Sequence, residues 1–320
     1  MASQSQNEWA SPSFTQGPPK GSRQGRVRLE NVRRVENRSG FGIVQANEFQ
    51  DLGRGPFEEL CELASKAVGV RFSPFVATSY RELSSALESG ELDLAWLPPI
   101  PTIDLIARDL ASPLAIPARR GATTYHAALI VRRGGPKSIE GLRGRRAAWV
   151  QRDSAAGYLV PRMNLAAKGH DVLRFFAREL FVHSHASVVD AVVNGDADVG
   201  ATYCHVDANG NIARSSWVDE GGRVMRPLDA LTTFGPIPND ALVGSNELPA
   251  ATRAGVTRWL LALDPASRGL FERLLGASDF RVPSPEHYVS LEHALRAARA
   301  RGHDALPPES RRSLRTRTSG

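Results

Sequence analysis

The segment Ser154-Ala155-Ala156-Gly157 has the residue types and spacing best suited to binding an anion. It follows a predicted buried strand and opens a predicted helix that runs to about residue 167. The first N–H groups of a helix have no acceptor within the helix and lie at the positive end of its dipole. Small side chains would let a ligand approach that backbone closely. The alternative is that Ser154 only caps the helix, and the segment alone leaves both interpretations open.

Other patterns with recognised chemistry are absent or incomplete. The sequence contains no GxSxG turn, no Walker loop, no HExxH and no GxGxxG after a strand. His183, His185, Cys204 and His205 offer nitrogen and sulfur ligands, but they lack the spacing of a structural zinc site. We therefore expect no metal, no bound cofactor and no catalytic motif.

The composition predicts a globular body with basic ends. Of 320 residues, 42% are hydrophobic and 23% are charged, which is ordinary for one large or two modest domains. The net charge of +6 comes from residues 1–38 and 299–320, which carry +4 each, while residues 39–298 carry −2. Basic tails are more often solvated than they are specific surfaces. We expect both ends to be disordered and no specific nucleic-acid partner.

The sequence shows no signal for export or for a membrane span. No apolar run reaches the roughly 18 residues of a membrane helix. Residues 1–25 are rich in Ser, Gln, Gly and Pro and lack the apolar stretch of a secretory signal. The sequence as written is expected to stay in the cytoplasm, and a misassigned start would instead place the protein in the periplasm.

From residue 39 onward, short apolar runs alternate with amphipathic helical patterns. Strands are predicted at 41–44, 70–76, 92–97, 114–116, 125–131, 147–150, 180–182 and 197–202. Helices are predicted at 56–68, 79–88, 102–110, 154–167, 171–178, 186–194, 249–262, 265–275 and 286–300, with a loop at 205–222. This alternation predicts an α/β fold whose sheets are mainly parallel and covered by helices on both faces.

Five stretches resemble, in the same order, the phosphate/phosphite/phosphonate-type substrate-binding proteins of ABC importers. They are YREL with AL and GELDLAW (80–96), YHAALIV (125–131), LRGRRAA with DSAAGYLVP (142–161), SH with AVVNGDADVGA (184–201) and IPND (237–240). The resemblance covers about residues 40–292. It implies a type 2 periplasmic-binding fold, in which two α/β lobes joined by two hinge strands close over a ligand. Residues 39–122 plus 236–298 would form lobe one, and residues 123–235 lobe two.

The matching positions in lobe one and at the hinge imply ligand contacts. Tyr80 and Tyr125 would pack on the ligand and donate hydrogen bonds from their hydroxyls. Asp240 would accept a hydrogen bond from an amine, a hydroxyl or a protonated phosphonate oxygen of the ligand.

The matching positions in lobe two imply an oxyanion site with two departures from the family pattern. Ser154 and the N–H groups of Ala155 and Ala156 would hold the oxyanion, and His185 would donate a hydrogen bond or a charge to it. The family commonly has several hydroxyls in this turn, whereas positions 155 and 156 are alanine here, and each lost hydroxyl removes a bond of roughly 1.5–3 kcal/mol. Asp153 would also repel a dianion. A zwitterion or a single carboxylate therefore fits better than phosphate or a simple phosphonate.

We expect a non-catalytic substrate-binding protein for a small anionic or zwitterionic ligand, working with an ABC transporter permease or a regulatory protein. One alternative is a cytoplasmic ligand sensor or an interaction module that uses the Arg-rich tails. Another is an enzyme on the same fold, for which His185, Asp153 and Asp240 are the acid/base candidates.

Overall fold

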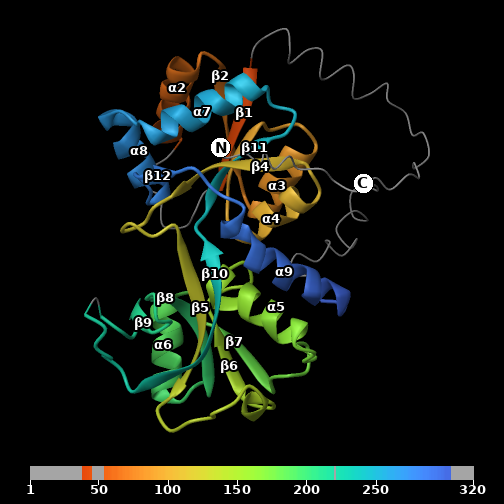
Figure 1. Cartoon of the computed structure of the whole chain (residues 1–320), viewed down its shortest axis with the longest axis vertical. Helices are drawn as coiled ribbons and strands as arrows, with labels where there is room; N and C mark the ends of the chain where they lie inside the picture. Colours follow the sequence, from red (N-terminus) through yellow and green to blue (C-terminus); the bar gives the residue numbers. More distant parts are fainter. Residues whose placement is uncertain (1–37, 45–53, 220, 304–320) are drawn as a thin grey trace, which may run out of the picture. The chain divides into compact units, whose positions relative to one another are not determined.

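The computed structural model describes residues 38–44, 54–219 and 221–303, which build two β-sheets flanked by helices (Figure 1). The first sheet has the spatial order β12 (Phe280–Arg281), β4 (Ala111–Pro117), β11 (Ala241–Ser245), β3 (Leu94–Leu97), β1 (Arg38–Val44) and β2 (Arg71–Ala77). The second has the order β10 (Leu228–Pro238), β5 (Thr124–Arg132), β8 (Val199–Val206), β6 (Arg146–Trp149) and β7 (Arg178–Phe181), and β9 (Ile212–Ser215) pairs with β8. The predicted α/β class is confirmed.

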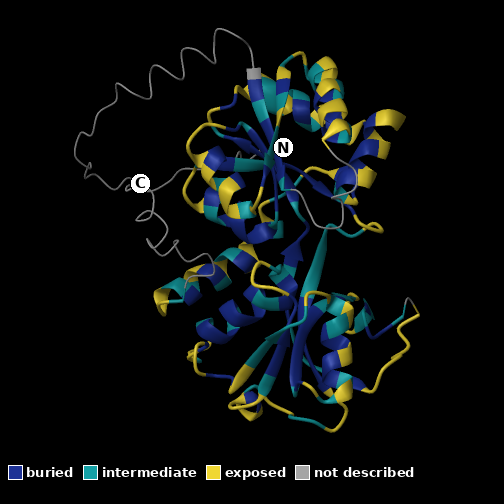
Figure 2. Ribbon diagram, turned by 180° about the vertical axis from the view of Figure 1, so that it is seen from behind, coloured by how far each residue is buried: buried dark blue, intermediate teal, exposed yellow. Residues whose placement is uncertain are grey.

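Helices bury both faces of each sheet. On the first sheet, one core includes α2 (Gly55–Val68), α7 (Ala250–Leu261) and α8 (Pro265–Leu275), and the other includes α3 (Tyr80–Glu88) and α4 (Pro99–Ala107). On the second sheet, one core includes η3 (Ala155–Leu159), α5 (Val160–Ala167) and α9 (Glu286–Ala300), and the other includes α6 (His185–Asn194). Figure 2 shows the strands buried and the outer helix faces exposed. This is the burial expected of apolar strands covered on two sides.

The sheets are mixed, so the prediction of mainly parallel sheets was wrong in that detail. The pairs β1–β3, β6–β7 and β6–β8 are parallel. The pairs β11–β3, β11–β4, β12–β4, β5–β8, β5–β10 and β8–β9 are antiparallel. The strands linked through helices run in one direction. Strands β5 and β11 each follow a crossing between the sheets. Each runs antiparallel to the helix-linked strands of its own sheet.

The chain passes between the sheets twice, and the two crossings are fixed to each other. One connection runs from β4 to β5 and the other from β10 to β11, and β5 and β10 lie side by side (Figure 1). Asn239 is only 5% exposed, and its Nδ2 donates to the carbonyls of Pro117 (2.9 Å) and Ala122 (3.0 Å). Its backbone N–H donates to the carbonyl of Thr123 (2.9 Å). One buried side chain therefore joins both connections.

Helix starts are set by local capping. The Ser79 hydroxyl accepts from the N–H of Glu82 (3.1 Å), and the Glu82 carboxylate accepts from the N–H of Thr78 (2.7 Å). This reciprocal pair starts α3 at Tyr80. In the same way, Ser184 accepts from the N–H of Ser187 (3.0 Å) and starts α6 at His185. Two predicted site residues thus stand at the first position of a helix.

Some predicted elements differ from the observed ones. No helix forms over 171–178, because Asp171 accepts from the N–H of Leu173 (3.1 Å) and from that of Arg174 (3.0 Å) in a tight turn that leads into β7. The predicted loop 205–222 contains the end of β8 and all of β9. The predicted disordered ends lie outside the described residues except for Arg38 and 299–303, and α9 continues to Ala300. The predicted lobe limits stay a prediction.

Replacing Asn239 tests how the crossings are held. Asn239→Ala removes the donor that serves two carbonyls, and we expect the free energy of unfolding to fall by about 2–3 kcal/mol. Urea denaturation followed by circular dichroism measures the change. Asn209→Ala, in the exposed β8–β9 turn, serves as the control and should change stability by less than about 0.5 kcal/mol. Equal stabilities for the two variants would contradict the role of Asn239.

Candidate functional site

Two oppositely charged residues meet at one edge of the first sheet. Strand β11 is antiparallel to both β3 and β4, and Ala241 lies opposite Leu97. The start of β11 therefore meets the carboxyl ends of β3 and β4, which is where ligands bind in open α/β sheets. Asp240 directly precedes β11, and Arg119 follows β4 by two residues. The topology places this pair where a ligand would lie.

Asp240 is the electrostatic centre of this edge. Its Oδ2 lies 3.7 Å from Nη2 of Arg119, and the side chain of Trp96 donates a hydrogen bond to its carboxylate. Burial raises the pKa of Asp240 above its ordinary value, while the Arg119 charge and the Trp96 hydrogen bond offset part of that rise. The Asp240 side chain is still 25% exposed, so a ligand can reach it.

Three tyrosines lie within electrostatic range of Asp240. Burial raises the pKa of each phenol, and the negative charge of Asp240 raises it further in Tyr80, Tyr125 and Tyr288. The predicted residues Tyr80 and Tyr125 therefore both lie within electrostatic range of the predicted residue Asp240. Their aromatic faces and hydroxyls could enclose a small polar ligand.

Tyr288 has an unsatisfied hydroxyl in this group. The residue is 6% exposed, and its Oη is buried without a hydrogen-bond partner among the described residues. A buried hydroxyl in that state costs about 1–3 kcal/mol. Next to it, His287 places Nε2 3.0 Å from Oγ1 of Thr123 and so ties α9 to the first crossing. A polar group of a ligand could satisfy the Tyr288 hydroxyl.

The turn before η3 follows β6 at the edge of the second sheet. The Ser154 hydroxyl accepts from the N–H of Gly157 (3.1 Å), so Ser154 caps the helix. The N–H groups of Ala155 and Ala156 lie in the first turn, where a helix supplies no acceptor. The charge of Asp153 contributes to the raised pKa of Tyr80, so this turn lies near the Asp240 group.

His185 follows β7 at the same edge, because β6, β7 and β8 are parallel. Its Nδ1 lies 3.0 Å from Oγ1 of the buried Thr202, which in turn lies 3.1 Å from Oγ of Ser216. The ring also packs edge-on against the ring of Tyr203, with 5.0 Å between the two ring centroids. Burial lowers the pKa of His185 to about 4. The imidazole is therefore neutral at neutral pH and can offer a ligand a hydrogen bond but no charge.

The predicted site residues form two groups in the structure. Tyr80 and Tyr125 each lie within electrostatic range of Asp240, and Asp153, which precedes the Ser154 turn, lies within electrostatic range of Tyr80. Within the described part of the chain, no hydrogen bond or ion pair joins His185 to the Asp240 group. The ligand-contact roles of all these residues stay predictions.

Sequence reasoning missed Trp96, Arg119 and Tyr288. Trp96 lies in a buried strand and looked like a core residue, and Tyr288 lies in a helix far along the chain. Arg119 is one of two adjacent arginines in a connection without a motif. No local pattern marks these residues, because their relation to Asp240 depends on long-range packing. Among residues 38–44, 54–219 and 221–303, no cluster of three or more His, Cys, Asp or Glu residues suited to a metal ion occurs.

The lowered pKa of His185 predicts a pH-dependent stability. The unfolded imidazole takes up a proton near pH 6.5, whereas the folded one does so only near pH 4, so stability is lost as the pH falls through that window. His185→Gln keeps a polar side chain but removes the titration. We expect its unfolding free energy to fall less than that of the wild type between pH 6.5 and 4.

Chemical denaturation at a series of pH values measures this difference. His293→Gln, on the exposed face of α9, is the matched control. Parallel pH profiles for the wild type and His185→Gln would contradict the burial of a neutral His185.

The chain matches a protein family over most of its length. The family model for "ABC transporter, phosphonate, periplasmic substrate-binding protein" matches residues 50–288. No helix among the described residues is both long enough and apolar enough to cross a bilayer.

Solved structures of similar fold include three bacterial proteins. XAC2383 from Xanthomonas citri bound to ATP is 23% identical with a TM-score of 0.63, covering 83% of this chain and 98% of that one. PA3383 from Pseudomonas aeruginosa, a binding protein component of an ABC phosphonate transporter, is 20% identical with a TM-score of 0.55, covering 83% and 87%. PhnD1 from Prochlorococcus marinus in complex with methylphosphonate is 16% identical with a TM-score of 0.53, covering 82% and 98%. At these identities the likeness establishes the fold alone.

The family match also bears on the predicted class of function. Its members are non-catalytic components of ABC transporters, bind a small ligand and are normally periplasmic, and the prediction that the chain is not an enzyme is confirmed. The resemblance noted in the sequence is confirmed as well. The chain belongs to the family of periplasmic substrate-binding proteins of phosphonate ABC transporters and has their two-lobed type 2 periplasmic-binding fold.

Proposed function

We propose that the protein binds a small zwitterion, with its cationic group at Asp240 and its singly charged acidic group at the Ser154 turn. The observation that carries this proposal is the half-buried Asp240 carboxylate among Tyr80, Tyr125 and Tyr288. A carboxylate with aromatic rings around it suits an ammonium group, which gains a charge-assisted hydrogen bond and favourable contact with aromatic faces. Delivery of this ligand to an ABC permease is the role that family membership supports.

The pairing of Asp240 with Arg119 is compatible with a cationic ligand. Their closest atoms are 3.7 Å apart, which is longer than the 2.7–2.9 Å of a good charge-assisted hydrogen bond. Arg119 also donates to the carbonyl of Leu275 (3.2 Å), so it has a second partner. An ammonium group at hydrogen-bond distance could therefore become the principal partner of Asp240 while Arg119 keeps its other contact.

The Ser154 turn favours a singly charged acidic group. It offers the N–H groups of Ala155 and Ala156 and one hydroxyl, and the neighbouring Asp153 is negative. His185 is neutral at neutral pH. The nearby Arg152 guanidinium is engaged, since it lies 4.7 Å from the centre of the Phe181 ring. A carboxylate or a monoanionic phosphonate matches this supply of donors better than a dianion does.

A ligand panel with an Asp240 variant tests the proposal. The panel holds amino acids, aminoalkylphosphonates, alkylphosphonates, small carboxylates, phosphate and ATP. A zwitterion at about 100 times its Kd should raise the Tm of the wild type by roughly 2–4 °C. Asp240→Asn should weaken zwitterion binding roughly ten- to hundredfold in calorimetry, because it removes a charged hydrogen-bond acceptor. Asp229→Asn, in a surface ion pair with Arg133 and Lys137, is the control.

The pH dependence adds a second readout to the same titration. Because the pKa of Asp240 is raised, zwitterion affinity of the wild type should fall as the pH is lowered toward that pKa, and this dependence should vanish in Asp240→Asn. Tighter binding of simple alkylphosphonates than of every zwitterion, or an unchanged affinity in Asp240→Asn, would contradict the proposal.

Adding hydroxyls to the turn tests whether the acidic group of the ligand lies there, independently of the cationic group at Asp240. The double variant Ala155→Ser/Ala156→Ser should favour doubly charged phosphonates relative to carboxylate zwitterions, since it adds two donors at the acidic end. An unchanged preference would mean that the acidic group does not lie at this turn, even if Asp240 binds the cation.

A further inference from the structure

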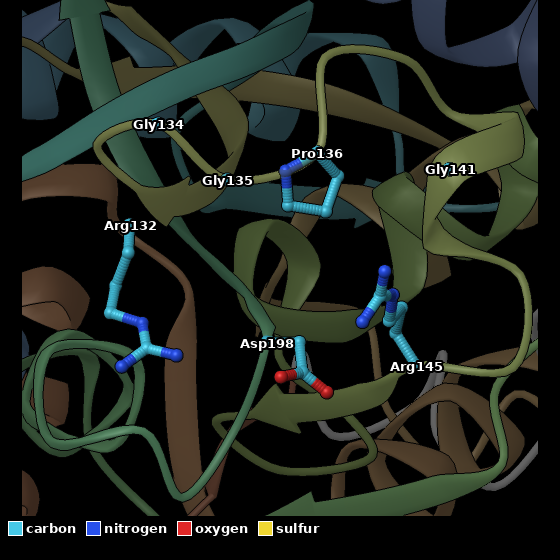
Figure 3. A pocket seen from close by; sticks show the side chains of 7 residues that line it. All are labelled: Arg132, Gly134, Gly135, Pro136, Gly141, Arg145 and Asp198. Atoms are coloured by element: carbon cyan, nitrogen blue, oxygen red, sulfur yellow. The ribbon is translucent and has the colours of Figure 1, made fainter.

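We propose a second anion site on the second sheet, in a pocket lined by two arginines and a glycine-rich turn, that takes a phosphate monoester of a small molecule. The pocket has a volume of about 450 Å³ and is lined by Arg132, Gly134, Gly135, Pro136, Gly141, Arg145 and Asp198 (Figure 3). None of these residues belongs to the Asp240 group or the Ser154 turn. This proposal is therefore independent of the proposed function.

Two arginine side chains supply the charge. Arg132 ends β5 and Arg145 directly precedes β6, and Figure 3 shows them on opposite sides of Asp198. Within the described residues, neither guanidinium forms an ion pair. Arginine offers two parallel N–H donors to the oxygens of a phosphate, and two arginines can together balance a dianion.

The one acidic residue lining the pocket is already neutralised. Asp198 accepts hydrogen bonds from Arg146 through N (3.0 Å), Nε (3.1 Å) and Nη2 (2.9 Å). These bonds, together with the charges of Arg146 and Arg145, hold the pKa of Asp198 down at about 2, so it remains a carboxylate paired with Arg146. The other cations of the adjoining loop are engaged as well, since Arg133 and Lys137 pair with Asp229. With Asp198 balanced by Arg146, Arg132 and Arg145 leave the pocket with a net positive charge.

The backbone holds both arginines in place. The N–H of Arg145 donates to Leu142 and its carbonyl accepts from Ala177, each at 3.0 Å. The carbonyl of Arg132 accepts from the N–H of Gly135 (2.8 Å) in a tight turn. A Cβ built on Gly195, the C-cap residue of α6, would lie 3.0 Å from Nη1 of Arg132. The Arg132 guanidinium therefore lies at the negative end of that helix.

The turn leaves room for a ligand beside the backbone. Gly134 has a left-handed φ of +81°, and a Cβ at Gly135 would meet the carbonyl oxygen of Arg132 at 2.8 Å. Both positions therefore favour glycine and keep this wall free of side chains. The volume lies in the range of small-molecule sites and leaves room for the organic part of a monoester beside its phosphate.

Arginine Nε–Hε resonances in ¹H–¹⁵N spectra of the full chain test the pocket residue by residue. Arg132→Gln and Arg145→Gln assign the two signals. Titration with glycerol phosphate should shift both signals with one saturation curve. Inorganic phosphate should shift the same signals with lower affinity, and the reverse order would identify the free ion as the better ligand of the same pocket.

Gly141→Asp places a carboxylate in the pocket, where a Cβ meets only Pro136 and Ser138 at 3.5 Å. It should weaken the response of Arg132 and Arg145 at least tenfold. The single variant Arg258→Gln, which also lowers the net charge by one but at an exposed position on α7, should leave the response unchanged. Signals of Arg132 or Arg145 that stay fixed in the wild type, or that shift equally in Gly141→Asp, would overturn the proposal.

Discussion

The buried amide of Asn239 is the contact on which the arrangement of the chain depends. Two hydrogen bonds from this side chain and one from the Asn239 backbone N–H, all of 2.9–3.0 Å, join the connection between β4 and β5 to the connection between β10 and β11. The next residue is Asp240, so the contact that fixes the crossings also fixes the carboxylate around which three tyrosines gather. His287 adds a bond from α9 to Thr123 in the first crossing. The candidate site is thus built beside the two connections that join the sheets.

Local sequence signals predicted the parts of the fold that local physics controls. Ser79 and Ser184 cap helices, and the alternation of apolar runs with amphipathic segments predicted strands β1 to β8. It did not predict β9, β10, β11 or β12, which follow β8 in the chain. The prediction failed where a local signal was ambiguous or the decisive contact was distant. Residues 171–178 have helical apolar spacing, but Asp171 closes a turn and Phe175 and Phe176 pack into the core instead. Strand direction could not be read from the sequence, because β5 and β11 are reversed by the crossings between the sheets.

The candidate site was likewise predicted only in part, because some of its features depend on distant contacts. The family resemblance pointed to Tyr80, Tyr125, Ser154, His185 and Asp240, and the structure brings Tyr80, Tyr125 and Asp240 together. It also adds what a linear pattern does not contain: the ion pair with Arg119, the hydrogen bond from Trp96 and the unsatisfied hydroxyl of Tyr288. The charge of His185 could not be predicted either, since its neutrality follows from burial beside Thr202 and Tyr203. Residue identity indicated where chemistry could occur, and packing determined its charge state.

In the proposed function the ligand reaches the Asp240 carboxylate, and the indole N–H resonance of Trp96 reports on that contact most directly. Trp96 donates to Asp240, whereas the Trp259 indole N–H is buried without a partner in the described structure and serves as an internal reference. In ¹H–¹⁵N spectra of the full chain, saturation with the zwitterion that binds best should shift the Trp96 indole signal and leave the Trp259 signal in place. A Trp96 signal that does not move while the zwitterion is bound would contradict the account, because the ligand would then lie away from Asp240.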